Sequence, residues 1–450
     1  MSTTARRRAC RRRGRLPRNL ATAFALGCAA PAATAAPFTS FDPSLMATGG
    51  AGVALDNART APLYNPAALA AAPARDRFAG TVAGGARLYD PGNLLPAIAD
   101  FERADYTDAV DDAIAQLEDH LRAGTPEASD VVAVGTAIEA LNDGLISVGN
   151  RLAQGEYGSS LVLSRPGGNT GLAITVSQWA AFGGDSTYSD GDLLDRVAGD
   201  MIRCGSKLEA GDSCDAADFE SFTIDADGSV VVAFDPAIDL QSEVRARGIV
   251  VRSTGLSLAQ AVSIQGNATT FGLTLKRQSI TVVDYASKLV DLDDNDIDDP
   301  RFRRSETSVN VDFGLLTELA PGWSAGLFVR NAIPQDFSTR LGNTIAIEPQ
   351  TRAGLARQGE HWRVTADVDV VPNDPVQLGE KTQFLGLGAE ADVSGWLTLR
   401  AGYRHNFPHN ERDVLTTGVG LQPTAGVQLD AAAIGGRAER GLAVRVAAGF

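Results

Sequence analysis

The sequence predicts an all-β transmembrane protein, an antiparallel outer-membrane β-barrel of about 14 strands with an inserted α-helical hairpin. Three observations predict this class. Segments near the C-terminus alternate apolar and polar residues, and the connections between these segments alternate between short and long. No run of roughly 18 uncharged apolar residues follows position 35, so the usual pattern of a transmembrane helix is missing. Barrel strands need no such run, because they are short and apolar on one face only.

The C-terminal segment carries the clearest alternation. Its apolar face consists of Leu442, Val444, Val446, Ala448 and Phe450, and the residues between them are small or charged. A strand with lipid on one side and water on the other has this pattern. An aromatic residue at the end of the apolar face resembles the C-terminal assembly signal of bacterial outer-membrane barrels, which we assign to Phe450, Ala448 and Val446. The resemblance implies recognition by the barrel-assembly machinery.

Similar alternation predicts further strands along the chain. These strands cover residues 81–89, 159–164, 172–179, 228–234, 256–265, 271–285, 309–314, 362–370, 397–404, 415–421 and 427–433. Charged residues such as Asp367 and Arg400 lie on the polar faces in mid-strand, as expected beside a watery lumen. A soluble β-sandwich also alternates, so the pattern alone does not exclude a soluble periplasmic β-protein.

The lengths of the connections favour the membrane barrel. With Phe450 placed on the periplasmic side, nine successive connections alternate long and short towards the N-terminus. The long ones are residues 434–441, 406–412, 371–380, 332–350 and 286–308, and the short ones are residues 423–424, 392–395, 358–360 and 321–322. Outer-membrane barrels have short periplasmic turns and longer outer loops, whereas a sandwich has no reason to sort loops by length.

The first 35 residues predict a secretory signal peptide of a Gram-negative bacterium. Eight arginines precede the apolar run 20–30, and residues 33–35 have the small side chains of a cleavage site. A twin-arginine signal at Arg12 and Arg13 and a lipoprotein site at Cys28 are alternatives. Cleavage leaves 32 basic and 55 acidic residues, a net charge of −23. Such acidity argues against nucleic-acid binding, which needs a cationic surface.

Residues 103–153 interrupt the strand pattern. Apolar residues spaced by three and four predict two helices, one with Val110 to Leu121 and one with Val134 to Leu152, separated at Gly124. The other helix faces are acidic, so this hairpin is too polar to span lipid. An outer loop, a periplasmic hairpin and part of a plug are all open positions for it.

Two cysteines remain after the signal peptide, Cys204 and Cys214, and in an exported protein they predict a disulfide. Two free thiols are the alternative. No Cys-x-x-Cys is present, which argues against thioredoxin-like redox chemistry.

Acidic residues crowd positions 291–299. Asp291, Asp293 and Asp296 are candidate Ca²⁺ ligands, because hard cations prefer several oxygens, but the segment lacks the central glycine and final glutamate of an EF-hand. A solvated acidic loop is the alternative, and no other cofactor is predicted. We find no nucleophile elbow, zinc spacing or phosphate loop, so the chain is not predicted to be an enzyme.

Two N-terminal motifs resemble the signature of long-chain fatty-acid transporters of the outer membrane. They are residues 46–54, which contain Gly49, Gly50 and Gly52, and residues 61–70, which contain Asn65, Pro66 and Ala67. In that family the Asn-Pro-Ala motif lies in a hatch that plugs the barrel. The resemblance therefore implies a hatch over residues 36–80 and a barrel over residues 81–450, and the named residues are hatch candidates.

A second resemblance covers nearly the whole chain after the signal peptide. Residues 38–43, 311–316, 373–375, 381–384 and 400–406 are similar to the conjugal-transfer TraF-like family, which is related to the fatty-acid transporter (FadL-like) barrels. The acidic helical insert departs from the transporters.

Two functions follow from these resemblances. The first is a barrel that binds or passes hydrophobic small molecules, and the alternative is an envelope interaction protein of a conjugal plasmid-transfer system without transport activity. Expected partners are outer-membrane lipid, lipopolysaccharide and the barrel-assembly machinery, with a hydrophobic ligand under the first hypothesis.

Overall fold

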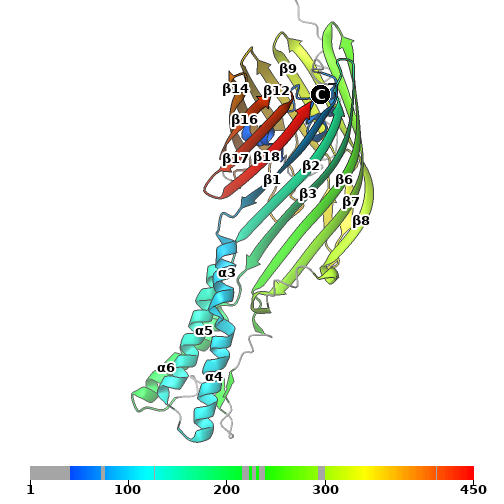
Figure 1. The fold of residues 1–450 in the computed structure, drawn as a ribbon. Helices are drawn as coiled ribbons and strands as arrows, with labels where there is room; N and C mark the ends of the chain where they lie inside the picture. Colours follow the sequence, from blue (N-terminus) through cyan, green and yellow to red (C-terminus); the bar gives the residue numbers. More distant parts are fainter. Residues whose placement is uncertain are drawn as a thin grey trace, which may run out of the picture. The chain divides into compact units, whose positions relative to one another are not determined.

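The computed structural model describes residues 41–71, 77–125, 127–214, 222–224, 230–232, 239–291, 299–411 and 413–449. Over these residues fourteen antiparallel strands close into one barrel, in which β1 pairs with both β2 and β18 (Figure 1). A closed barrel has no unpaired edge, and this arrangement lets strands cross lipid. The predicted fold class and number of strands are confirmed.

The barrel strands follow the chain order except where two small hairpins intervene. Their bounds are β1 (Ala79–Tyr89), β2 (Leu152–Arg165), β3 (Thr170–Thr187), β6 (Glu243–Ile264), β7 (Asn267–Lys288), β8 (Arg303–Ala320), β9 (Trp323–Arg330), β12 (Gln350–Gln358), β13 (Trp362–Asp369), β14 (Phe384–Ser394), β15 (Leu397–Asn406), β16 (Val414–Thr424), β17 (Val427–Gly435) and β18 (Glu439–Gly449). Strand β3 therefore pairs with β6, and β9 pairs with β12.

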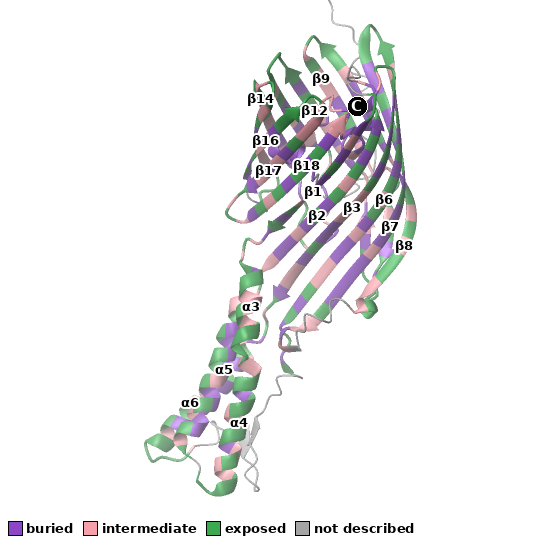
Figure 2. Cartoon of the chain, viewed as in Figure 1, coloured by how far each residue is buried: buried purple, intermediate pink, exposed green. Residues whose placement is uncertain are grey.

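The outside of the barrel is apolar and its inside is polar. On β18, Leu442, Val444 and Val446 are 60%, 54% and 55% exposed, whereas Arg445 is 3% exposed and faces the lumen. The same alternation appears as stripes on the neighbouring strands (Figure 2). The predicted faces of the C-terminal strand are correct, and no second sheet covers its apolar face in the described part of the chain. The protein is an outer-membrane β-barrel.

Loop length sorts by end of the barrel. The end that holds Ala79 and Gly449 carries short turns at residues 166–169, 265–266, 321–322, 359–361, 395–396 and 425–426. The other end carries the longer connections at residues 90–151, 188–242, 289–302, 331–349, 370–383 and 407–413. By the loop-length rule the first is the periplasmic end and the second is the outer end.

One predicted outer loop is wrong. Residues 434–441 were expected to form a long connection, but pairing between β17 and β18 continues to Gly435 and Arg440. Only residues 436–438 connect these strands.

Strand length differs around the barrel. Strands β6 and β7 have 22 residues each, and β3 and β8 have 18. Strands β12 to β18 have 8 to 11, which is the length that crosses a membrane. The outer parts of the long strands therefore continue past the membrane. We call them the raised wall and define it as residues 178–187, 243–252, 277–288 and 303–309.

The N-terminal residues 41–71 lie inside the barrel. Helix α2 (Pro43–Ala47) contacts β15, β16, β17 and β18. The short 3₁₀ helix η2 (Pro66–Leu69) contacts β3, β6, β7 and β8, and η1 (Ala61–Leu63) packs beside η2. We call residues 41–71 the hatch, because they cross the lumen from one wall to the other.

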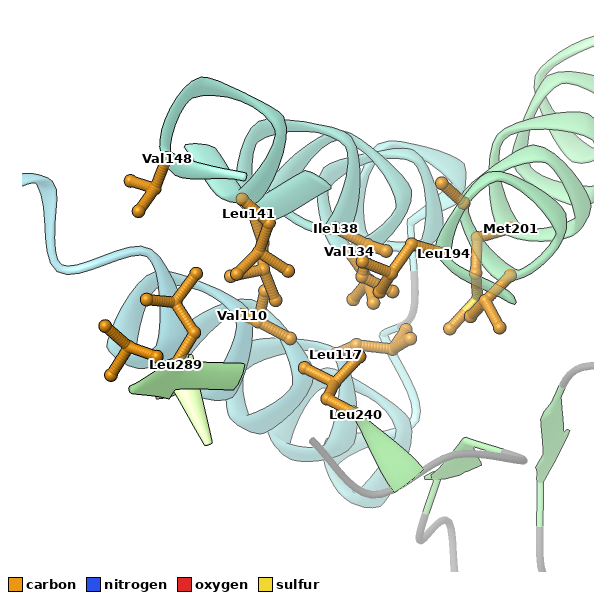
Figure 3. Packing of buried hydrophobic residues seen from close by; sticks show 14 of the residues in the cluster. Val110, Leu117, Val134, Ile138, Leu141, Val148, Leu194, Met201, Leu240 and Leu289 are labelled. Carbon is orange, nitrogen blue, oxygen red and sulfur yellow. The ribbon is translucent and has the colours of Figure 1, made fainter. Parts of the chain in front are cut away.

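An apolar core at the outer end joins Ala153 of β2, Val244 of β6 and Tyr285 of β7 to four helices, which we call the helical arm. They are α3 (Leu94–Ala104), α4 (Tyr106–Ala123), α5 (Ala128–Val148) and α6 (Gly191–Glu209). Figure 3 shows Val134 and Ile138 of α5 packed between Leu117 of α4 and Leu194 of α6. The insertion between β1 and β2 belongs to the outer end, which excludes the periplasmic position.

The prediction for residues 103–153 is partly wrong. The first helix begins at Leu94, and Leu152 belongs to β2 because it pairs with Asp185. Helix α6 was not predicted, and its core residues include Cys204, which forms the predicted disulfide with Cys214. The weak strand predicted at residues 228–234 contributes β5 (Val230–Val232), which pairs with β4 (Phe222–Ile224) outside the barrel.

Among the described residues, α5 is the one helix that is both long enough and apolar enough in composition to cross a membrane. Half of its apolar window is buried, and it packs against α4 and α6 as the central helix of the arm.

Candidate functional site: the hatch and the outer lumen

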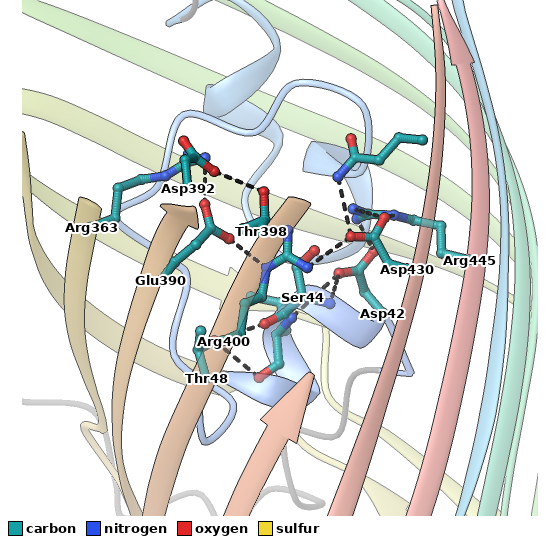
Figure 4. Close-up of polar contacts among 12 residues, drawn as sticks. Asp42, Ser44, Thr48, Arg363, Glu390, Asp392, Thr398, Arg400, Asp430 and Arg445 are labelled. Carbon is teal, nitrogen blue, oxygen red and sulfur yellow. Dashed lines mark hydrogen bonds and ion pairs between the residues drawn. The ribbon is translucent and has the colours of Figure 1, made fainter. Parts of the chain in front are cut away.

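A chain of charges joins the start of the hatch to the barrel wall (Figure 4). Arg445 donates from Nη1 to Asp42 Oδ2 at 2.7 Å and from Nη2 to Asp430 Oδ2 at 2.7 Å. Arg400 donates to the other oxygen of Asp430 at 2.8 Å and also pairs with Glu390. Asp42 caps α2 as well, because its Oδ1 accepts from the backbone N–H of Ser44 at 2.9 Å. These buried pairs join the hatch to β18 directly and, through Arg445 and Asp430, to β17, β15 and β14.

Lumenal side chains also hold the glycine-rich hatch backbone. Asp367 Oδ2 accepts hydrogen bonds from the N–H groups of Gly52 and Val53 at 2.8 and 2.9 Å. Thr416 Oγ1 donates to Ala47 O at 2.9 Å and accepts from the N–H of Gly49 at 3.0 Å. Arg352 Nη1 donates to the carbonyl of Gly50 at 3.0 Å. Hatch candidates Gly49, Gly50 and Gly52 therefore make backbone contacts with the wall.

The wall in turn offers glycines where the hatch comes closest. A Cβ atom on Gly402 would lie 2.2 Å from the backbone nitrogen of Gly49, and one on Gly272 would lie 2.2 Å from that of Ala67. Neither position can carry a side chain without moving the hatch. Close hatch contacts of the same kind occur at Gly158, Gly171, Gly314, Gly326, Gly386, Gly388 and Gly418.

The Asn-Pro-Ala motif locks the other half of the hatch. Asn65 is fully buried, and its Nδ2 donates to Val53 O at 2.7 Å and to Leu315 O of β8 at 3.2 Å. Its Oδ1 accepts from the N–H of Ala67 at 3.1 Å, so Asn65 caps η2, and Pro66 occupies the first helical position. Burial raises the pKa of the neighbouring Tyr64, whose hydroxyl donates to Asn57 O at 2.9 Å. The motif is structural: it joins the hatch to itself and to β8.

The hatch separates two spaces in the lumen. A cavity of about 630 Å³ lies against the periplasmic turns and is lined by hatch residues and by the Arg363–Glu390–Arg400 group. A cavity of about 70 Å³ lies on the other side, between Leu63 of the hatch and Trp179 of β3.

The smaller cavity mixes apolar and polar groups. Lys276 and Asp312 form an ion pair at 2.7 Å in its wall. Within the described part of the chain, the buried atoms Trp179 Nε1, Thr175 Oγ1 and Gln350 Oε1 around it have no hydrogen-bond partner. Buried polar atoms normally have partners, so this space suits water or a polar group of a ligand.

Above this cavity, the inner face of the raised wall is apolar. Its buried residues, together with those that cover them, form what we call the outer apolar cluster: Ala181, Ile249, Val251, Ile280, Val282, Phe337, Ile345, Ile347 and Val376. Phe337 lies in β10 (Gln335–Ser338), and Ile345 and Ile347 lie in β11 (Thr344–Ile347). The β10–β11 hairpin of an outer loop thus folds onto the wall and covers it.

Asp284 fastens this hairpin to the raised wall. Its Oδ2 accepts from Thr339 Oγ1 at 2.6 Å and from Asn343 Nδ2 at 2.8 Å, and both donors flank the hairpin turn. Arg247 Nε lies 3.5 Å from the other carboxylate oxygen. The cover is therefore held at its tip by the Asp284 carboxylate and by a hydrogen bond from Arg340 Nε to Arg303 O at 3.3 Å, and along its length by apolar packing.

A second closure lies at the outer ends of β1, β2 and β18. Arg87 pairs with Glu156 at 3.1 Å and with Glu439 at 3.2 Å, and Arg404 also pairs with Glu439. Glu411 of the 407–413 loop is buried beside this group, and burial raises the pKa of its carboxyl although Arg87 and Arg404 oppose the shift.

Several predicted site residues lie outside the described part of the chain. They are the signal peptide residues 1–35, Phe450, Asp293 and Asp296. Asp291 ends the short helix η3 (Leu289–Asp291). Within the described residues, no group of three or more His, Cys, Asp or Glu side chains is arranged to hold a metal ion. The C-terminal residues Val446 and Ala448 lie in β18, and Val446 faces outward.

The fold and the lumenal hatch define the class of protein, an outer-membrane barrel closed by its own N-terminal segment. The chain belongs to a family described as the F plasmid transfer operon protein TraF, whose sequence model matches residues 62–369. No curated protein matches the chain in sequence.

Matching solved structures include two toluene transporters and a FadL homologue. The Ralstonia pickettii toluene transporter TbuX has 12% sequence identity, and the match covers 91% of this chain and 98% of that one, with a TM-score of 0.46. The Pseudomonas putida toluene transporter TodX has 12% sequence identity, and the match covers 91% of this chain and 98% of that one, with a TM-score of 0.47. A Pseudomonas aeruginosa FadL homologue has 13% sequence identity, and the match covers 93% of this chain and 99% of that one, with a TM-score of 0.47.

Proposed function

We propose that the barrel binds hydrophobic small molecules at the outer apolar cluster and passes them toward the hatch. The observation that carries this proposal is the apolar inner face of the raised wall, which lies above the polar part of the lumen and is covered by a loop hairpin rather than by another strand of the barrel. Small-molecule sites are typically concave and apolar with a few polar groups, and the binding would be non-covalent.

The residues also suggest an access route. Movement of the β10–β11 hairpin would uncover Ile249, Ile280 and Val282, and a bound molecule would then lie directly above the cavity between Trp179 and Leu63. Such a movement must break the hydrogen bonds to the buried Asp284 carboxylate, and also those from Arg340 to Arg303 O and from Gln335 to Val309 O. Passage beyond this point requires the hatch to shift, because its backbone is held against the wall.

Trp179 provides a built-in reporter for binding. The other three tryptophans, Trp323, Trp362 and Trp396, are 37%, 43% and 58% exposed near the periplasmic turns. Replacing these three with phenylalanine leaves Trp179 as the single emitter. Titration of this protein in lipid nanodiscs with toluene and with laurate should change the Trp179 emission in a saturable way. An unchanged or strictly linear response with both ligands contradicts the proposal.

A matched pair of substitutions locates the binding site. Ile280→Gln places an amide on the covered wall, whereas Leu341→Gln makes a similar change at the hairpin tip, where Leu341 is 47% exposed. We expect Ile280→Gln to weaken binding about tenfold, since a buried aliphatic side chain is worth about 1.5–3 kcal/mol, and Leu341→Gln to leave it unchanged. Equal affinities would place the ligand elsewhere.

The helical arm favours a second candidate function, contact with an envelope partner during plasmid transfer. The arm carries a disulfide, and its helices are insertions between barrel strands that pack on the outer ends of β2, β6 and β7. Replacement of residues 91–150 by a short turn tests this function in a donor strain. Reduced transfer with intact Trp179 titration would support it, and normal transfer would argue against it.

Three earlier predictions remain part of the proposal. We propose export by a signal peptide cleaved after residue 35 in a Gram-negative cell, assembly through Phe450, Ala448 and Val446, and weak Ca²⁺ binding at Asp291, Asp293 and Asp296. N-terminal sequencing of the mature protein tests the first, and an N-terminus other than Ala36 would contradict it. Deletion of Phe450 tests the second, and calorimetric titration with Ca²⁺ tests the third.

A further inference from the structure

The outside of the raised wall carries a basic hollow at the outer edge of the apolar band. The hollow has a volume of about 690 Å³ and lies over β1, β2, β3, β6, β7 and β8. Its lower lining is apolar and includes Val82, Leu161 and Val176. Its upper lining is polar and includes Arg252 and Arg277. The change from apolar to polar lining marks the height at which hydrocarbon ends.

The strand register shows that both arginines face outward. Arg252 pairs across the ladder with Gln178 and with Ser279, and Arg277 pairs with Thr254 and with Val309. Because Thr254 lies two residues from Arg252, the two arginines are diagonal neighbours on the outer face, a separation that long side chains can bridge. Both are exposed, whereas the lumenal arginines of the barrel are largely buried in ion pairs.

The two guanidinium groups are available to a ligand. Arg252 Nε donates to the neutral amide of Gln178 at 3.0 Å, and Gln178 in turn donates to the hydroxyl of Tyr157 at 3.1 Å. Arg277 makes no hydrogen bond or ion pair within the described part of the chain. None of the residues that line the hollow is acidic, although the whole chain has a net charge of −15.

We propose that this hollow binds a phosphate group of lipopolysaccharide in the outer leaflet. Arginine matches phosphate in charge and in hydrogen-bond geometry, and two arginines side by side can hold one phosphate between them. Hydroxyl groups of Ser159, Thr254 and Thr307 suit the sugar of the head group. The apolar residues just below suit its acyl chains. The loop lengths place this edge at the outer end, where lipopolysaccharide is the anionic lipid.

The site would give the barrel a fixed height and a preferred lipid on the side of the raised wall. Its two arginines point away from the lumen, because Arg277 and Arg252 are exposed whereas Lys276, the neighbour of Arg277 on β7, is buried and faces inward. The proposal therefore does not depend on transport of hydrophobic molecules.

The experiment compares lipid binding by the full barrel and by a double variant. Arg252→Gln with Arg277→Gln removes both charges, and Arg357→Gln is the matched control. Arg357 is an exposed arginine on β12, near the periplasmic turns, where it stacks over Trp323. The probes are bis-phosphorylated lipopolysaccharide, the same lipid after enzymatic dephosphorylation, and phosphatidylglycerol, each titrated into detergent-solubilised protein and followed by native mass spectrometry.

We expect the wild type and the Arg357→Gln variant to bind phosphorylated lipopolysaccharide at least about tenfold more tightly than the double variant does, as one lost charge-assisted hydrogen bond already predicts. Dephosphorylated lipopolysaccharide should bind the wild type and the double variant equally. Equal binding of phosphorylated lipopolysaccharide to all three proteins would overturn the site. Phosphatidylglycerol binding as tight as that of lipopolysaccharide would overturn the proposed ligand.

Discussion

The anchoring of the hatch by Arg445 can be tested by replacing this residue with methionine. The substitution keeps a long side chain but removes three hydrogen bonds, one to Asp42 and two to Asp430. Asp430 keeps Arg400 as a partner, so the larger effect falls on Asp42, which keeps its backbone contacts at the start of α2. Breaking a buried ion pair costs about 3–5 kcal/mol of stability. Because Asp42 and Asp430 keep other partners, we expect the hatch to lose stability near the lower end of this range, about 3 kcal/mol.

Hydrogen–deuterium exchange of residues 41–55 measures this loss directly, because it reports the free energy of local opening. About 3 kcal/mol corresponds to exchange about 100-fold faster in the hatch, with barrel strands far from β18 unchanged. Arg440→Met, an exposed position on the same strand, is the matched control and should have no effect.

A double variant separates the ion pair from general damage. Asp42→Asn keeps the cap but removes the charge, so its effect should be smaller once Arg445 is already methionine. We expect the two changes to be less than additive by about 1 kcal/mol or more. Additive effects, or less than about threefold faster exchange in the Arg445→Met variant, would refute the view that this pair anchors the hatch.

Three further predictions concern the arm and the hatch. In the arm, the hydrogen bond from His120 to Asp130 raises the pKa of His120, while burial of Asp130 is outweighed by hydrogen bonds from His120 and the Glu127 N–H, which lower its pKa. The pair therefore stabilises the arm most between pH values of about 4 and 6.5, and this stabilisation is lost at higher pH as His120 deprotonates and at lower pH as Asp130 becomes protonated. In the His120→Gln variant, the thermal unfolding temperature of the arm should no longer be raised in this pH range. A pH profile identical to that of the wild type would contradict the prediction. Reduction of the Cys204–Cys214 disulfide should destabilise the arm by about 3 kcal/mol, the value expected for a loop of this length, with faster amide exchange in α6 but not in the barrel strands. Gly402→Val should displace the hatch and raise protease cleavage within residues 41–55. Gly435→Val is the control and should not raise cleavage, because a Cβ atom at this position has no other atom within 4 Å. Equal cleavage of the two variants would refute the steric argument.

Local patterns in the sequence were sufficient to predict the barrel. The alternation in residues 442–450 reports which side chains meet lipid, and loop length reports which end is outside. Strand ends were predicted less well, because the sequence of the raised wall is polar outside and apolar inside, the reverse of the membrane part. On β6 the inward Val251 is buried and the outward Arg252 is exposed, whereas in the membrane part of the same strand the outward residue is Leu256.

The site depended on contacts between distant residues and was mostly not predictable. Arg445 is recognisable as a lumenal charge, but nothing local links it to Asp42, 403 positions away. The glycines of the wall were visible as mid-strand residues, and only the three-dimensional path of the hatch explains them. Helix α6 was missed although Leu194, Val197, Met201 and Cys204 repeat at helical spacing, and Asp284 was missed because a single inward carboxylate has no local partner.

The orientation of β18 is the central claim, and site-specific quenching tests it most directly. Single cysteines at Leu442 and Val446 and, as the lumenal control, at Gln428 beside the larger cavity would carry a bimane fluorophore in bilayers with brominated lipid. We predict strong quenching by the brominated lipid at 442 and 446, and quenching at 428 by aqueous iodide alone. Protection of positions 442 and 446 from the lipid quencher would contradict the membrane barrel.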